Sequence, residues 1–318
     1  PQLQGVYLVE CGTHCVVDAG FWPCHTSERV GGFRVLRSVR RGTLLLWDRG
    51  FHDFAMVVAA RQRGAHVLGR LPAQVKPLPL RTLPDGSLLA YLLPSDDARR
   101  RRGVRLLVRI ITYTINDPAL PGYGEEHRLI TTLLNPRLAP AVEVACCYHE
   151  RWAIELVIDE IDTHQRLVGR TLRSLTPVGV IQELYGLLLA HDAVRVLMHE
   201  AALQVAEDRD RLSFVYALEI VRDAIPEFQQ VAAAQQPALY ERMLREIAAK
   251  RLPARRLRSN PRVVKRKMSN FKLKRAEHYQ PPTPQHCFRE AVVVQPPPVI
   301  ELPHSLPVVR ATMLVERR

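Results

Sequence analysis

The sequence predicts an α/β protein with a mixed sheet flanked by helices. The first 71 residues read, in order, as strand, strand, helix, strand, helix and strand, which is typical of this class. The chain has 318 residues, 47% of them hydrophobic, enough for one large domain or two smaller ones. With this supply of core residues the composition is not that of a disordered chain.

The elements of this first region follow from short apolar runs and their breaks. Residues 5–12 and 14–19 are two such runs separated by Gly12-Thr13, which predicts a hairpin. The run 43–47 (TLLLW) has no polar alternation, which is typical of a buried central strand. We expect the other elements over 26–39 (a helix capped by Thr26), 53–63 (helix) and 65–71 (strand).

Beyond residue 71 the pattern changes three times. Prolines, a Pro84-Asp85-Gly86-Ser87 turn and β-branched runs predict an antiparallel insertion of about four strands, with Arg99–Arg102 in a loop that is solvated or contacts DNA. A helical pattern follows from Ala141 until Pro226, with one more helix at about 237–250. We therefore divide the chain into 1–71 (first part of the core), 72–134 (β-rich insertion), 135–225 (helical second part), 226–280 (helix and basic tail) and 281–318 (proline-rich, expected to be disordered).

The charge predicts a polyanionic partner. The formal net charge is +13, and each Lys or Arg that meets a phosphate releases a counterion. An anionic membrane surface is an alternative partner. Membrane spanning is excluded, because no run approaches the ~18 apolar residues that a spanning helix needs.

The cysteines and the first residues of the sequence indicate the redox state of the compartment and the state of the N-terminus. Cys11, Cys15 and Cys24 with His14 and His25 are open to a zinc-site interpretation, but an apolar run more often holds Cys as a small buried hydrophobe. With no paired framework and no signal peptide, we expect a reducing compartment. Because the first residue is Pro1 and an apolar run follows, we expect an N-terminally truncated chain.

Asp48 is the first candidate for chemistry. It directly follows the buried strand, in Trp47-Asp48-Arg49-Gly50-Phe51. A carboxylate in this position is suited to hold a metal ion at the edge of the sheet. The alternative is an ordinary capping Asp in a strand-to-helix turn.

A second candidate is a polar stripe on one helix. Tyr148, Arg151, Glu155 and Asp162 fall at offsets 0, 3, 7 and 14, which brings them to one face at 3.6 residues per turn. Such groups are costly to bury unless they line a cavity or bind a charged ligand. The alternative is a solvated face with Arg151 and Glu155 as an i,i+4 pair.

Taken together, the two segments resemble the DDE transposases of bacterial insertion sequences, in particular the insertion-sequence-four group. That group has a D-R-G-F/Y motif and a helix signature of Tyr, two residues, Arg, three residues, Glu, six residues, Lys. The chain offers Asp48-Arg49-Gly50-Phe51, then Tyr148, Arg151 and Glu155 in register. The Arg-Trp-x-Ile-Glu core and the later SNPRVVKRKMSNF are also similar, so the likeness spans roughly residues 1–275.

The resemblance implies an RNase H-like core with a β-rich insertion before the helix that carries the catalytic Glu. It makes Asp48 the second acid and Glu155 the third acid of a triad that holds two Mg²⁺ (or Mn²⁺) ions, ~3.5–4 Å apart, for attack on a phosphodiester. Tyr148 and Arg151 are then expected to position the DNA strand. The implied partners are double-stranded DNA at element ends and target, and a second copy of the chain, in the nucleoid of a bacterial cytoplasm.

The chain departs from the family pattern at two points. The first Asp belongs on a strand upstream of the hairpin, which this sequence does not contain; Asp18 is the early acid that we weigh as a substitute. Asp162 stands where the signature has Lys, and Arg166, one turn further, is expected to compensate in part.

A basic tail completes the expected DNA-binding residues. Residues 253–275 contain no Asp or Glu. Phosphate contacts are expected from this tail, and Phe271 offers a stacking surface. Its predicted DNA-binding residues are Arg262, Lys265, Arg266, Lys267 and Lys272. The alternatives to an active transposase are a catalytically inactive DNA-binding remnant and, more distantly, a general RNase H-like nuclease.

Overall fold

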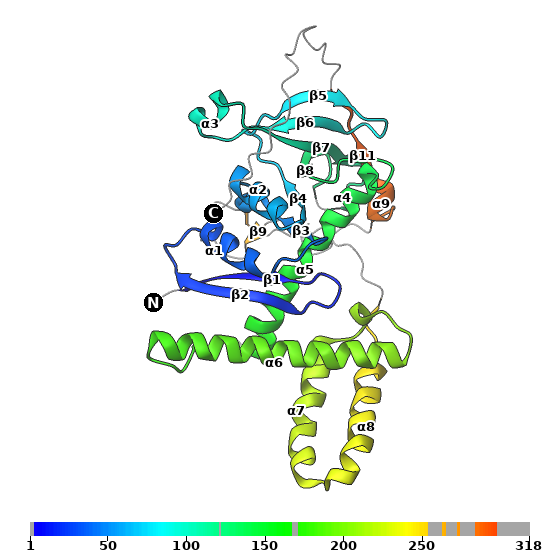
Figure 1. Cartoon of the computed structure of the whole chain (residues 1–318). Coiled ribbons are helices and arrows are strands. Elements are labelled where there is room, and N and C mark those ends of the chain that lie inside the picture. The colour runs from blue at the N-terminus through cyan, green and yellow to red at the C-terminus, as the bar shows by residue number, and fades with distance from the viewer. Residues whose placement is uncertain are drawn as a thin grey trace.

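The structure is a computed structural model and describes residues 3–120, 122–166, 171–253 and 284–297, together with the backbone of 263–264 and 272–273. Its centre is a seven-stranded sheet in the order β3-β4-β8-β7-β6-β5, with β11 paired to β7 (Figure 1). β3 and β4 are parallel and the other pairs are antiparallel, so the predicted mixed sheet is confirmed. The strands are β3 (Leu44–Trp47), β4 (His66–Arg70), β5 (Leu78–Thr82), β6 (Leu88–Leu92), β7 (Leu106–Ile115), β8 (His127–Thr131) and β11 (Val292–Val294).

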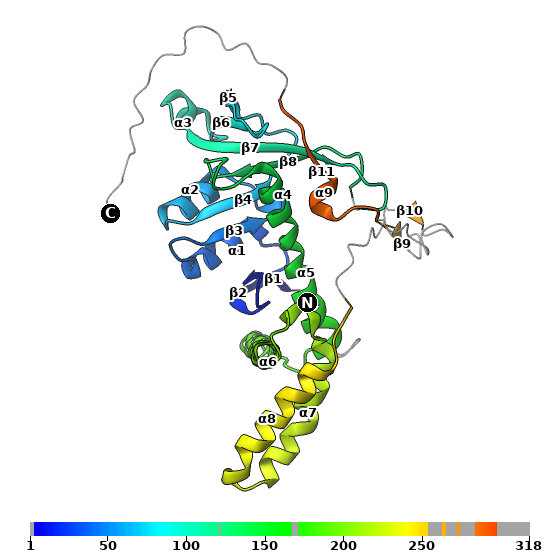
Figure 2. The same ribbon diagram turned by 90° about the vertical axis from the view of Figure 1, so that its right-hand side faces the viewer.

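The predicted hairpin forms a small sheet of its own. β1 (Leu3–Val9) and β2 (Val16–Pro23) pair in antiparallel fashion. Figures 1 and 2 both place this hairpin on the β3 side of the large sheet. Within the described residues β3 pairs with β4 alone, so its prediction as a central strand is wrong. Its apolar run is buried because helices cover both faces, not because strands lie on both sides.

Helices cover the sheet on both faces. On one face, α1 (Glu28–Val35) packs on the hairpin so closely that a Cβ on Gly31 would meet Val6 at 2.6 Å. Next to it, α2 (Phe54–Gln62) buries Met56 and Val57 against β3 and β4. The opposite face is covered by α4 (Ala141–His149), whose small residues pack against strand residues of β4 and β7.

The helix that carries the signature changes its winding. The segment 141–165 runs from α4 through a 3₁₀ turn (Glu150–Trp152), α5 (Ala153–Asp159) and a π-helical stretch (Glu160–Gln165). π-helical stretches are rare and occur frequently at functional sites. Figure 2 shows this rod running from the large sheet down to the hairpin and to the long helix α6 (Pro177–Gln204).

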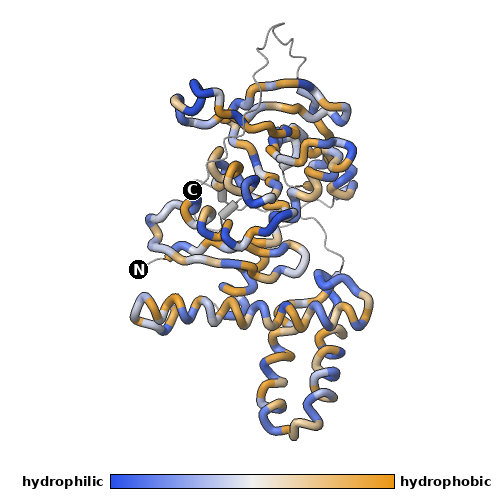
Figure 3. Tube along the Cα trace, viewed as in Figure 1, coloured by the Kyte–Doolittle hydropathy of each residue, from blue (hydrophilic) through white to orange (hydrophobic). Residues whose placement is uncertain are grey.

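A helical extension lies beyond α6. α7 (Phe214–Gln230) and α8 (Gln236–Ala249) pack as a pair that projects away from α6 (Figure 1). We expected Pro226 to end the helical region, but α7 continues for four residues past it. Ala224 and Phe228 on either side of Pro226 pack into the shared core of this extension, which favours continued helix. Figure 3 shows hydrophobic residues along α6 and on the inner sides of the pair.

Two further expectations are corrected. Of Arg99–Arg102, expected in a loop, the first three lie in the short helix α3 (Asp97–Arg101), which is capped by Asp96. Disorder from residue 281 onward is wrong for 284–297, where α9 (Phe288–Ala291) leads into β11. Apolar residues there dock on the core, and the buried Asp117 carboxylate accepts the amides of residues 285 and 286.

No helix in the described part of the chain is long and apolar enough to cross a membrane. In the basic tail, β9 (Val263–Val264) and β10 (Lys272–Leu273) form a short parallel pair. Arg262, Lys265, Arg266 and Lys267 lie outside the described residues, and of Lys272 only the backbone is described.

Candidate active site

Asp48 is held at the end of β3 by its own turn. Trp47, the last residue of β3, lies across Gly69 of β4; a Cβ on Gly69 would meet the indole nitrogen at 2.1 Å, so this position requires glycine. The Asp48 side chain is exposed, and its Oδ1 accepts the Gly50 amide at 2.8 Å. The capping geometry is therefore present. It does not exclude metal binding, because one cap uses only one of about four lone-pair sites on a carboxylate.

A basic pocket adjoins this turn. It has a volume of about 420 Å³ and is lined by Arg29, Arg49, Gly50, His52, Pro72, Gln74 and Val75. His52 Nδ1 is buried with no hydrogen-bond partner among the described residues, and burial lowers the pKa of His52. The pocket therefore combines two guanidinium groups with a neutral imidazole, a donor set suited to a phosphate group.

The start of α4 is fixed by a buried ion pair in the insertion. The Asp85 carboxylate accepts the Ala141 amide at 2.9 Å and binds Arg109 of β7. Arg109 is fully buried, and it also donates to Ser87 Oγ at 2.7 Å and to the Ala139 carbonyl at 2.6 Å. The predicted Pro84–Ser87 turn thus anchors the first turn of the signature helix.

The signature residues make a compact group on this helix. The Arg151 guanidinium lies 5.9 Å from the Tyr148 ring and 5.2 Å from the Trp152 ring, measured to the ring centroids. Its Nη2 lies 3.7 Å from Glu155 Oε1, so the i,i+4 pair that we weighed is present. Arg151 Nε is buried and has no hydrogen-bond partner among the described residues.

Tyr148 links the two halves of the site. Burial raises the pKa of its hydroxyl, Asp48 adds to the rise, and Arg151 and Arg70 oppose it. Asp48 at the end of β3 is therefore within electrostatic reach of Tyr148, and Tyr148 is next to Arg151. The sequence reasoning missed Arg70, although a cation that ends the strand beside β3 is a recognisable signal.

Asp162 does not stand as an unpaired negative charge. Arg166 Nη1 lies 3.1 Å from Asp162 Oδ1. Both groups act on Tyr7 of β1, whose pKa is raised to about 12 by burial and by Asp162, while Arg166 lowers it. Asp162 and Arg166 therefore lie toward the hairpin, where the two charges pair with each other.

The π-helical stretch is locked onto α6 by buried charges. Glu160 accepts from Arg195 and from His191, at 3.0 and 2.9 Å. The neighbouring Asp192 accepts the Val16 amide of β2 at 2.8 Å. The end of the signature helix, α6 and the hairpin are thereby joined.

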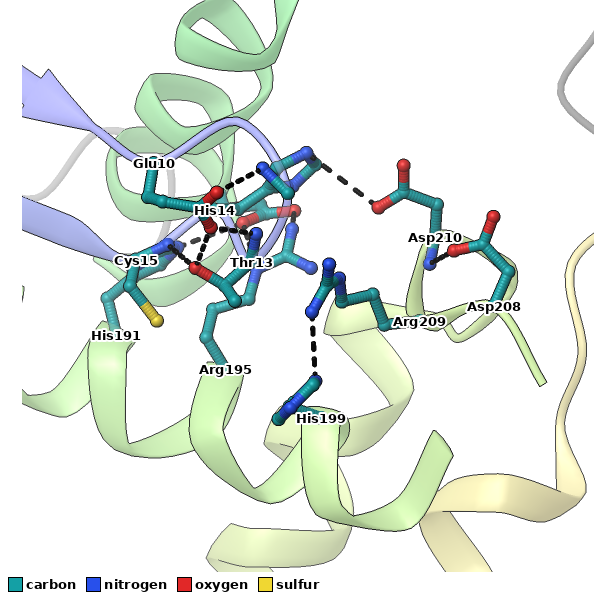
Figure 4. Close-up of polar contacts among 12 residues, drawn as sticks. Glu10, Thr13, His14, Cys15, His191, Arg195, His199, Asp208, Arg209 and Asp210 are labelled. Atoms are coloured by element: carbon teal, nitrogen blue, oxygen red, sulfur yellow. Dashed lines mark hydrogen bonds and ion pairs between the residues drawn. The ribbon is translucent and has the colours of Figure 1, made fainter. Parts of the chain in front are cut away.

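The hairpin loop is held to the same region. Figure 4 shows the loop residues above His191 and Arg195, with His14 directed at Asp210, 3.8 Å away. Glu10 accepts from Thr13 within the loop at 2.5 Å. Arg209 and His199 are in contact at 3.0 Å below it. The contact between His14 and Asp210 links the hairpin loop to the segment between α6 and α7.

The candidate metal ligands are two carboxylates, Asp48 and Glu155. Carboxylates such as Asp48 and Glu155 are the hard ligands that Mg²⁺ takes, and Mg²⁺ is often held by one or two carboxylates plus phosphate oxygens. Within the described ranges no group of three or more His, Cys, Asp or Glu residues is arranged to hold a metal ion. Asp18 is engaged elsewhere: Arg37 lowers the pKa of its carboxyl through hydrogen bonds of 2.8 and 2.9 Å, and Ser38 also donates to it.

Comparison with known proteins decides the family. The profile of the family described as "Transposase DDE domain" matches residues 4–192, more than half of the chain. The chain belongs to the DDE transposase family. The matched region contains the Asp48 turn and the whole signature helix, so the family resemblance seen in the sequence is confirmed.

One curated relative and one solved structure are similar to the chain. This DDE transposase chain is 29% identical over 277 residues to "Transposase InsG for insertion sequence element IS4" of Escherichia coli (strain K12). The match covers 83% of the chain and 60% of that protein, so the chain spans about three fifths of the length of this curated relative. Among solved structures, a cryo-EM structure of the piggyBac transposase synaptic complex with hairpin DNA matches with a TM-score of 0.42 and 10% identity, over 77% of this chain and 51% of that one.

Proposed function

We propose that this chain cuts and joins DNA strands at the ends of an insertion sequence, as a metal-dependent transposase. The observation that carries the proposal is the position of Tyr148, within electrostatic reach of Asp48 and beside the Arg151–Glu155 pair. Two acids from distant parts of the sequence thus have a common neighbour. This common neighbour supports the proposal that Asp48 and Glu155 face the same side of the molecule, as a shared metal ion would require.

Each residue has a distinct task in this proposal. Asp48 and Glu155 would hold Mg²⁺ or Mn²⁺, which supplies activation of the attacking oxygen and neutralises charge on the leaving oxygen. Arg151, whose side chain is 19% exposed, binds a phosphate oxygen of the DNA through the exposed part of its guanidinium group. Tyr148 packs beside it and fixes the guanidinium, and Arg70 adds positive charge on the same side. Arg166 and the basic tail residues Arg262, Lys265, Arg266, Lys267 and Lys272 are proposed to bind the DNA backbone further along.

The strand that ends at Asp48 has an edge without a strand partner among the described residues. Within the described residues β3 pairs only with β4, and β1 pairs only with β2, so each has an edge without a strand partner. Helices cover the hairpin and the large sheet on the same two faces. We infer that an extended segment carrying an acid pairs with β3, adjacent to Asp48, and completes the ligand set.

The test is a nicking assay on supercoiled DNA that carries an element end, with Mg²⁺ or Mn²⁺. D48N and E155Q are each expected to reduce nicking more than about 100-fold, because even second-shell changes at metal sites cost about 10–100-fold. E219Q, at an exposed acid on α7, is the matched control and should nick at the wild-type rate. Nicking that survives both D48N and E155Q contradicts the proposal.

The second candidate is a DNA-binding remnant without catalysis. It is supported by the two-carboxylate ligand set, since metal binding depends on ligand count and geometry. A gel-shift series at several salt concentrations separates the two. Binding that weakens steeply with salt, without nicking in either metal, selects the remnant. In both cases we propose double-stranded DNA as the partner, a homodimer on paired ends, and the bacterial nucleoid as the location.

A further inference from the structure

The long helix α6 exposes an apolar stripe along its whole length. Five large side chains of this helix reach solvent: Val178 (68% exposed), Tyr185 (39%), Leu189 (70%), Val196 (47%) and Leu203 (67%). They follow one another at intervals of seven, four, seven and seven residues. This is the spacing of a coiled-coil seam, in which apolar residues recur every 3.5 residues on average.

The stripe carries no charge. The acids of α6 are all engaged with other parts of the chain: Glu183 accepts backbone amides at 173 and 174, Asp192 accepts the amide of Val16, and Glu200 accepts from Tyr240. Arg195 is buried on Glu160. A partner that binds through acidic or basic groups therefore finds no complementary charge on the exposed side of α6.

The middle of the stripe allows close approach of another helix. The exposed residues there are small: Gly186, Ala190 and Ala193. A Cβ built on Gly186 would meet nothing within 4 Å. Figure 2, which looks along α6, shows the hairpin on one side of this helix and the α7–α8 pair on another, and no described element beyond its remaining side.

Four of the five stripe residues match when the helix is reversed, and the fifth, Leu189, falls opposite Asp192. Val178 and Leu203 are equidistant from a point halfway between residues 190 and 191, and so are Tyr185 and Val196. This point is also the middle of α6, which runs from Pro177 to Gln204. A second α6 laid antiparallel about that point would bring Val178 opposite Leu203 of the second copy and Tyr185 opposite Val196 of the second copy. Self-complementarity of this kind is what a two-fold symmetric interface requires.

We propose that α6 is a self-association surface, paired antiparallel with α6 of a second copy about a two-fold axis at the middle of the helix. This inference gives a surface to the dimer included in the proposed function. It is tested without DNA or metal, so its failure is distinguishable from a failure of catalysis.

The expected dimer is weak. A helix of 28 residues is about 42 Å long at ~1.5 Å per residue, and with a diameter of about 10 Å it offers roughly 400 Å² per copy. The total of roughly 800 Å² is below the roughly 1,200–2,000 Å² of stable interfaces. The assay therefore has to reach protein concentrations of about 100 µM, where a micromolar association is populated.

The first experiment is sedimentation equilibrium of the full chain over a concentration series. The wild-type mass should rise from that of a monomer toward that of a dimer, and L189E and L203E should each weaken association by at least about 10-fold. I225E is the matched control, because Ile225 is an apolar residue, 51% exposed, on α7 and not on the stripe. A wild-type chain that stays monomeric overturns the proposal, and so does equal weakening by I225E.

The second experiment tests the antiparallel register. V178K and L203E should each weaken the dimer, and the double variant V178K/L203E should recover most of the loss, because it sets Lys against Glu at both ends of the pair. A parallel pairing, or association through another surface, gives no recovery. A double variant no better than L203E alone therefore overturns the arrangement. Far-UV circular dichroism of each variant verifies that the fold is retained.

Discussion

Removal of the Asp85 carboxylate should destabilise the protein more than removal of any exposed acid. Arg109, its partner, is fully buried between β7 and the start of α4. The substitution D85A leaves the guanidinium charge in place without its counter-charge. It also removes the acceptor of the Ala141 amide at the start of the signature helix.

The magnitude follows from these two losses. Breaking a buried ion pair from one side costs about 3–5 kcal/mol, because an uncompensated charge stays buried. Loss of a helix-capping acceptor costs typically about 1 kcal/mol. We therefore expect a loss of about 4–6 kcal/mol in the free energy of unfolding, a large part of the roughly 5–15 kcal/mol that stabilises a typical protein.

Urea unfolding followed by circular dichroism measures this loss. D96A is the control, since Asp96 caps only the short exposed helix α3, and its loss should cost about 1 kcal/mol. The double variant D85A/R109M should regain much of the stability, because it removes the buried charge as well. The reasoning is refuted if D85A costs no more than D96A, or if the double variant is less stable than D85A alone.

Three further outcomes are expected. Burial lowers the pKa of His191, but hydrogen bonds to Asp192 and Glu160 outweigh it, so the folded-state pKa is raised above 6.5. The stabilising contribution of the charged imidazole is therefore fully present below about pH 6.5 and is lost as pH rises through the folded-state pKa. H191Q should abolish this dependence of the free energy of unfolding on pH, measured by urea unfolding. R49Q should reduce the slope of log binding constant against log salt by about 1 in gel shifts, because one phosphate contact is lost from the basic pocket; an unchanged slope excludes that contact. F288A should cost about 3–5 kcal/mol in urea, because Phe288 is a buried anchor of α9; a loss below about 1 kcal/mol contradicts that docking.

Much of the local structure was predictable because its signals are local. The hairpin follows from two apolar runs and a Gly-Thr break, and the four antiparallel strands from β-branched runs and the Asp85 turn. The helical segment with Tyr148, Arg151 and Glu155 follows from its three- and four-residue spacing. The family follows from the Asp48 turn and this helix taken together.

The rest depends on contacts between distant segments. The residues of β3 do not alternate between apolar and polar, which indicates burial on both faces of the strand. This pattern contains no information on which strands are the neighbours of β3. Order at residues 284–297 comes from Asp117 and from apolar side chains of α4, which a proline-rich sequence does not show. The helix continues past Pro226 because α8 packs against it, a tertiary effect that outweighs the local preference.

The residues of the proposed site were predictable from the sequence, but the contacts that hold them in place were not. The approach of Asp48 to Tyr148 depends on how β3 packs beside α4, and the sequence gives only the two motifs. The buried pairs of Asp85 with Arg109 and of Glu160 with Arg195 hold the two ends of the signature helix. Neither pair has a spacing that could identify it, because its members are 24 and 35 residues apart.

The central claim is that Asp48 and Glu155 bind the same divalent ion. Titration of the chain with Mn²⁺, followed by electron paramagnetic resonance of the free ion, tests it without DNA cleavage. The account predicts that D48N and E155Q each weaken Mn²⁺ binding at least about 10-fold and that the double variant is hardly weaker than either, because one site is lost in all three. Wild-type Mn²⁺ affinity in either single variant, or losses that add fully in the double variant, would contradict a shared ion.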